Sequence, residues 1–253
     1  MAKRYKLRRF NMFMGFFHLV QSIIMFLLSN DFTLPITTNY LRFNPETLNL
    51  QPFPEIAFNL RIGPMVALFL LLSAIAHITI SVPSVYNWYI KNIKKGLNPA
   101  RWYEYSISSS VMIVVIAMLV GVYDLSSLLL IFFINMMMIF FGHVMEVHNQ
   151  TTKKVNWLSY IYGCVAGIIP WVVIALYLFG SADGENRAPD FVYWIFFSIF
   201  LFFNVFAVNM VLQYKKVGRW KDYAFGEKVY IILSLAAKSL LAWQVFAGTL
   251  RPS

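Results

Sequence analysis

The sequence has few charged residues, a single cysteine and a shortage of acidic side chains. Of its 253 residues, 13% are charged, whereas 59% are hydrophobic and 18% are aromatic. Soluble domains carry about 25% charged residues, so this composition excludes an ordinary soluble domain and indicates a membrane protein. The single cysteine, Cys164, excludes an intramolecular disulfide framework and a zinc-finger-type cluster.

The sequence is rich in long apolar runs. Seven of them reach about 20 residues, the length at which a helix crosses a bilayer. They predict an all-α bundle of seven transmembrane helices that forms a single domain over residues 1–253. The first run is too long for a signal peptide and lacks an A-x-A-like cleavage site, so we expect a retained helix. The expected spans are 10–29, 62–88, 99–122, 125–147, 157–180, 190–213 and 228–249.

The net charge is +10, and the residues that carry it lie between the apolar runs, as they do at a membrane surface. This pattern does not indicate nucleic-acid binding. Basic residues are concentrated in the N-terminus and after the second, fourth and sixth spans. The positive-inside rule therefore predicts a multi-pass cell-membrane protein with a cytoplasmic N-terminus and an external C-terminus. The 16 basic residues on the cytoplasmic side are Lys3, Arg4, Lys6, Arg8, Arg9, Lys91, Lys94, Lys95, Arg101, Lys153, Lys154, Lys215, Lys216, Arg219, Lys221 and Lys228, against Arg42, Arg61, Arg187 and Arg251 outside.

The longest connection, about residues 30–61, is external in this orientation. Its segments "NYLRF" and "TLNLQ" alternate partly in polarity and flank the turn residues Asn44-Pro45-Glu46. This pattern is compatible with a short β-hairpin or with an irregular loop. Before the third span, "LNPARW" predicts Asn98 as N-cap and Pro99 at the first helical position.

Within the spans and away from their ends, only Lys238 and Glu104 are of charged type. Lys238 is ten residues from both Lys228 and Gly248, which places it about 15 Å from either end of its helix. The ammonium group cannot reach either interface from there, and a charge inside a membrane marks a functional site. Glu104 is the natural partner, although a purely structural ion pair is the alternative.

Two histidines fall at a similar depth. His18 and His77 lie about 12 Å and 16 Å from the cytoplasmic ends of their helices. Four titratable groups at one level predict a polar cavity around Lys238. Serines four residues away extend this set on the same helix faces; they are Ser73, Ser108 and Ser234.

A desolvated lysine is suited to Schiff-base formation with an aldehyde, and a buried carboxylate can serve as the counter-ion. Aromatic side chains could enclose a long conjugated ligand, with ordinary core packing as the alternative for each of them. The candidates are Tyr105, Trp171, Phe203, Phe206 and Trp243.

Together with the seven spans and the cytoplasmic N-terminus, four segments resemble the heliorhodopsins, over essentially the whole chain. These segments are "FFHLVQS" (16–22), "SAIAHITIS" (73–81), "RWYEYSISSS" (101–110) and "SLAAKS" (234–239). The resemblance implies all-trans retinal bound covalently to Lys238 and Glu104 as counter-ion. It also implies that His18 and His77 line the Schiff-base cavity.

The resemblance extends to further residues and to assembly. It implies a β-hairpin after the first helix, a homodimer in the lipid bilayer, no ion transport and light signalling to an unknown cytoplasmic partner. Its remaining site residues are Ser73, Ser108 and Ser234 in the cavity, Gln21 and Asn135 in the polar core, Tyr105 and Met138 beside the chromophore, and Gly167 in the pocket.

The function that follows is a retinal-binding photoreceptor that is not an enzyme and signals by conformational change. The alternatives are a light-driven proton or ion transporter or channel, and a seven-helix receptor without photochemistry. A pump needs carboxylates on both sides of the Schiff base, and the span interiors offer only Glu104. The basic loop 214–228 is either a docking site or ordinary positive-inside charge with interfacial Trp220 and Tyr223.

Overall fold

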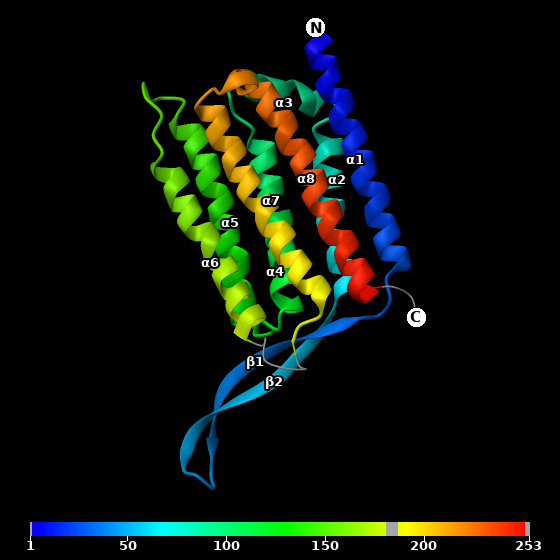
Figure 1. Cartoon of the computed structure of the whole chain (residues 1–253), viewed down its shortest axis with the longest axis vertical. Helices are drawn as coiled ribbons and strands as arrows, with labels where there is room; N and C mark the ends of the chain where they lie inside the picture. The colour runs from blue at the N-terminus through cyan, green and yellow to red at the C-terminus, as the bar shows by residue number, and fades with distance from the viewer. Residues whose placement is uncertain (1, 181–186, 251–253) are drawn as a thin grey trace.

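The computed structural model describes residues 2–180 and 187–250, without the side chains of residues 2–6. Its helices pack side by side as a bundle, and a long hairpin extends from one end (Figure 1). The elements are α1 (Ala2–Leu28), β1 (Thr33–Asn44), β2 (Asn49–Arg61), α2 (Ile62–Thr79), α3 (Pro83–Lys94), α4 (Pro99–Leu119), α5 (Leu125–His148), α6 (Leu158–Gly180), α7 (Asp190–Tyr214), the 3₁₀ turn η2 (Gly218–Lys221), α8 (Tyr223–Val245) and the π-helical turn η3 (Phe246–Leu250).

Seven of the described helices are long and apolar enough to cross a membrane, which confirms the predicted bundle. The most enclosed of them is α4, in which 72% of the apolar window is buried. Most faces of α4 are therefore covered by other parts of the protein. Asn98 caps α4 as predicted, since its side-chain oxygen accepts a hydrogen bond from the Arg101 amide at 3.2 Å.

The second predicted span was too long. We expected one helix over residues 62–88, but α2 ends at Thr79 and α3 begins at Pro83. Val82 is extended because a following proline disfavours helical backbone, and Pro83 occupies the first turn of the new helix. The helix α3 lies across the end of the bundle at which α1 begins (Figure 1), where it buries Tyr86, Tyr89, Ile90 and Ile93.

The β-hairpin is confirmed. Its strands pair antiparallel from Thr33 opposite Arg61 to Asn44 opposite Asn49. At the turn, the Asn44 side chain accepts a hydrogen bond from the Glu46 amide at 2.9 Å. At the other end the Thr37 amide donates to the Tyr123 carbonyl at 2.9 Å, so the hairpin is attached to the α4–α5 connection.

That connection ends in a second helix cap. The Asp124 carboxylate accepts hydrogen bonds from the Ser126 hydroxyl and, at 2.9 Å, from the Ser127 amide. These bonds hold the pKa of Asp124 below its usual range. The start of α5, against which the hairpin rests, is therefore fixed by local hydrogen bonding.

Candidate functional site

The Lys238 ammonium is buried and lies in a compact polar group between α2, α4 and α8. Its Nζ atom donates to Glu104 Oε1 at 2.7 Å, to Ser73 Oγ at 2.5 Å and to Ser234 Oγ at 3.1 Å. Ser73 in turn donates to Glu104 Oε1 at 2.6 Å. Both members of the ion pair are more than nine-tenths buried. Three donor and acceptor groups thus hold the amine in one position, next to its counter-charge.

The two predicted histidines lie together beside this pair. The rings of His18 and His77 are nearly parallel, with centroids 5.8 Å apart. His77 Nδ1 is 2.9 Å from the Asn11 side-chain oxygen, whereas neither ring nitrogen of the fully buried His18 has a hydrogen-bond partner among the described residues. Asn11 is a member of this polar group that the sequence interpretation did not include.

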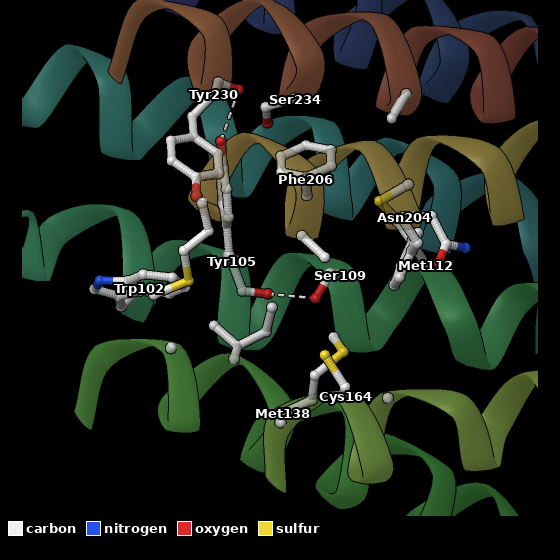
Figure 2. A pocket seen from close by; sticks show the side chains of 18 of the residues that line it. Trp102, Tyr105, Ser109, Met112, Met138, Cys164, Asn204, Phe206, Tyr230 and Ser234 are labelled. Atoms are coloured by element: carbon white, nitrogen blue, oxygen red, sulfur yellow. Dashed lines mark hydrogen bonds between the residues drawn. The ribbon is translucent and has the colours of Figure 1, made fainter. Parts of the chain in front are cut away.

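An apolar pocket of about 200 Å³ opens on the other side of Lys238, between α4, α5, α6, α7 and α8. On α4 its wall runs from Trp102 to Met112, about 15 Å along the helix axis. Figure 2 shows Met138 and Cys164 on the α5–α6 side, facing Phe206, Tyr230 and Ser234 across the pocket. The predicted residues that line it are Lys238, Tyr105, Ser108, Ser234, Met138, Gly167, Trp171, Phe203 and Phe206.

Aromatic contacts fix the wall beside the amine. The ring of Tyr105 lies 5.1 Å from Lys238 Nζ and meets Phe206 edge to face at 5.5 Å. Its hydroxyl donates to the Tyr230 carbonyl at 2.9 Å. Farther along the pocket, Trp171 makes edge-to-face contacts with Phe200 and Phe203 at 5.2 and 5.3 Å. Aromatic side chains therefore form the pocket wall both beside the amine and farther along.

Three further predicted residues lie outside the pocket wall, in addition to Glu104, His18, His77 and Ser73 described above. Asn135 is buried on α5 and donates hydrogen bonds to Ser109 and Ser110 on α4, at 2.9 and 3.0 Å, so it links α5 to α4. Gln21 accepts from the Trp243 indole at 3.1 Å, which ties α1 to α8. These side chains are polar contacts within the bundle, and Trp243 does not enclose the pocket.

A buried ion cluster at the α3 end of the bundle was missed. Arg101, counted above among the loop charges, is buried and contacts Glu227 and, at 2.6 Å, Glu146. Both glutamates are fully buried. These two carboxylates lie at or just outside the ends of the predicted spans, so a count restricted to span interiors did not include them. Since these residues lie near span ends, the sequence pattern resembles ordinary interfacial charge, and only the packing of α4, α5 and α8 brings them together.

The aromatic residues of the basic loop are also tied to the bundle. The Trp220 indole donates to Asn209 at 2.6 Å, and the Tyr223 hydroxyl donates to Glu146 at 2.7 Å. Each of these half-buried side chains is thus hydrogen-bonded to a buried residue of the bundle.

Seven helices able to span a membrane, a buried amine beside a carboxylate and an aromatic pocket fit the class of rhodopsins. The heliorhodopsin family model matches residues 7–250, and the chain belongs to that family. Its members are rhodopsins, retinal-binding membrane proteins of the photoreceptor type, and not classical enzymes. No curated protein sequence matches the chain.

Proposed function

We propose that all-trans retinal is bound through a Schiff base to Lys238, that Glu104 is the counter-ion, and that the protein is a light sensor. The observation that carries this proposal is the 2.7 Å contact between Lys238 and Glu104 at the wall of an aromatic pocket. Burying an ion pair inside a membrane bundle is costly compared with apolar packing. A requirement for a reactive amine with a fixed counter-charge would explain why this costly ion pair is present.

The pocket residues fit such a chromophore. The wall is mainly apolar and aromatic, and glycines at 142, 163 and 167 line it. A Cβ atom at Gly167 would overlap the sulfur of Met138, and one at Gly142 would overlap the Trp102 ring. Retinal, when bound, supplies visible-light absorption and isomerisation. The chain supplies the attachment atom, the charge that stabilises it and the shape of the pocket.

The signalling part of the proposal rests on how α8 is connected. Lys238 lies on α8, and Tyr223 at the start of the same helix donates a hydrogen bond to Glu146 on α5. A shift of α8 would therefore change contacts at the α7–α8 loop, where Lys215, Lys216, Arg219 and Lys221 lie. We propose that this basic loop presents the changed surface to a cytoplasmic partner.

Orientation and assembly belong to the same proposal. The bundle end that holds α3 and the basic loops is cytoplasmic by the positive-inside rule, and the hairpin is external. The hairpin carries exposed apolar side chains, among them Tyr40, Leu41 and Phe53. We propose that it packs against a second copy of the chain in a homodimer, which a cross-linking measurement in membranes would show.

Retinal titration of the purified chain tests the chromophore assignment. We expect a visible absorption band in the wild type and none in Lys238→Ala. Lys228→Ala is the matched control, since it removes a lysine from the same helix ten residues away, and it should keep the band. A band that survives Lys238→Ala would contradict the proposal.

A further inference from the structure

A second cavity, of about 30 Å³, lies where α1, α2, α3, α4 and α8 meet, and we call it the polar cavity because most of the residues that line it are polar or charged. Its wall includes Asn11, His77, Tyr89, Glu104 and Glu227. A cavity of this size holds about one water molecule. The carboxylate residues Glu104 and Glu227 thus line the same small space.

Along α4, the ion pair at Lys238 and the Arg101 cluster are close to each other. Glu104, the partner of Lys238, and Arg101, the partner of Glu227, are three residues apart on neighbouring positions of one helix face. That spacing corresponds to a rise of about 4.5 Å. Less than one helical turn therefore separates the ion pair at Lys238 from the Arg101 cluster.

The two glutamates of the cluster differ in their free acceptor positions. Glu146 accepts four hydrogen bonds, two on each oxygen, from the side chains of Arg101, Tyr223 and Trp102 and the amide of Asn98. Because a carboxylate has about four lone-pair sites, Glu146 is saturated. Glu227 Oε2 accepts only from the Asn98 side chain, at 2.5 Å, among the described residues. Glu227 can therefore receive a proton without losing a donor.

The charge balance favours protonation of the same cluster. Arg101 carries one positive charge against two glutamates, so the fully ionised cluster has an excess negative charge in a buried site. A proton released by the Lys238 nitrogen would remove that excess, so the ionised cluster is a good proton acceptor at a site where solvation by water is weak. The other polar and titratable groups around Glu227 are Tyr89 on α3, Asn98 on α4, Gln213 and Tyr214 on α7, and Tyr223 and Tyr230 on α8.

A second row of polar groups leads to the same carboxylate. His77 Nδ1 lies 2.9 Å from the Asn11 side-chain oxygen, and Tyr89, whose buried hydroxyl has no hydrogen-bond partner among the described residues, lines the same cavity as Glu227. Burial raises the pKa of Tyr89, so its hydroxyl stays protonated and can donate. The polar cavity is thus bordered by polar side chains of α1, α2 and α3 as well as by Glu227.

We propose that Glu227 accepts, through the polar cavity, the proton that the Lys238 nitrogen releases after illumination, and later returns it. An N–H bond at Lys238 breaks and an O–H bond at Glu227 forms, which leaves both groups neutral; the reverse transfer restores both charges. No proton crosses the membrane. This inference rests on the proposed function, because it requires a chromophore on Lys238.

Time-resolved infrared difference spectroscopy on the retinal-reconstituted full chain tests the inference. In the wild type a carboxylic-acid band should appear and decay with the deprotonated Lys238 nitrogen. Glu227→Gln should lose the band and Glu227→Asp should keep it at a shifted frequency. The matched control Glu146→Gln should keep the band at its frequency, with a smaller amplitude because this variant already removes the excess negative charge of the cluster. A band that persists in Glu227→Gln, or disappears only in Glu104→Gln, would overturn the inference. Failure of the wild type to form a visible band would instead overturn the proposed function.

A cavity-filling variant leaves both carboxylates in place. Ala100 lines the polar cavity, and Ala100→Val would occupy much of its small volume. We expect the rates of proton release from Lys238 and of its return, both measured by flash photolysis, to decrease at least tenfold. Unchanged rates in Ala100→Val, with the visible band intact, would show that the proton does not use this cavity.

Discussion

The Nζ atom of Lys238 lies 2.7 Å from Oε1 of Glu104, although 134 residues separate the two in sequence. The contact joins α8 to α4 near the middle of the bundle. Ser73 on α2 binds both groups, so three helices meet at this one ion pair. Any change in the charge of either residue therefore acts on the packing of three helices at once.

Replacing Glu104 tests its role as counter-ion. In Glu104→Gln the protonated nitrogen on Lys238 loses its nearby negative charge. We expect a smaller visible band at neutral pH and a shift of the remaining band to longer wavelength. Spectrophotometric titration measures both effects, and Glu104→Asp should largely preserve the wild-type spectrum. A Glu104→Gln spectrum identical to the wild type would assign the counter-charge to another group.

A methyl group at Gly167 should narrow the apolar pocket. Alanine is favoured over glycine in a helix by about 1 kcal/mol, but its Cβ would overlap the Met138 sulfur and push that side chain into the pocket. We expect Gly167→Ala to weaken retinal binding at least tenfold in a titration. Met138→Ala should restore much of the affinity in the double variant. Gly180→Ala on the same helix, which meets no atom within 4 Å, should bind normally.

Removal of Arg101 should destabilise the protein. Arg101→Met leaves Glu146 and Glu227 buried without a positive partner, which costs about 3–5 kcal/mol. Thermal unfolding in detergent should show a clear decrease in the melting temperature. The triple variant Arg101→Met, Glu146→Gln, Glu227→Gln should recover part of the loss. Arg42→Met, which breaks an exposed ion pair with Glu55, should cost less than about 1 kcal/mol.

Illumination should produce no sustained ion transport. The buried carboxylates of the described chain, at 104, 146 and 227, all lie on the α3 side of Lys238, so no buried acid offers a proton exit toward the hairpin. We expect vesicles containing the retinal-bound protein to show no continuing light-driven pH change. A sustained change that Lys238→Ala abolishes would favour the transporter alternative.

Cysteine labelling can establish the orientation. In a Cys164→Ser background, Leu48→Cys places an exposed thiol at the hairpin turn and Thr151→Cys places one in the α5–α6 connection. In intact cells a membrane-impermeant reagent should label only position 48. Labelling of position 151 should require permeabilised membranes, and the reverse pattern would invert the proposed topology.

Several features followed from the sequence because their physical cause is local. Apolar length determined the seven helices, the Asn98-Pro99 pair determined the start of α4, and turn residues around Pro45 agreed with a hairpin. The Lys238–Glu104 contact was also predicted, because so few charges lie deep in the spans that each has few alternative partners. The end of α2 was missed although Pro83 signals it, since hydropathy continues across the break.

Tertiary structure alone decided the contacts that depend on how helices are rotated and tilted against each other. Arg101, Glu146 and Glu227 look like interfacial charges in the sequence, and only the packing of α4, α5 and α8 buries them in one cluster. The polar cavity that joins this cluster to Glu104 is likewise formed by five elements. Hydropathy and helical periodicity tell which residues can face inward, but the partner of each depends on long-range packing, which no local pattern encodes.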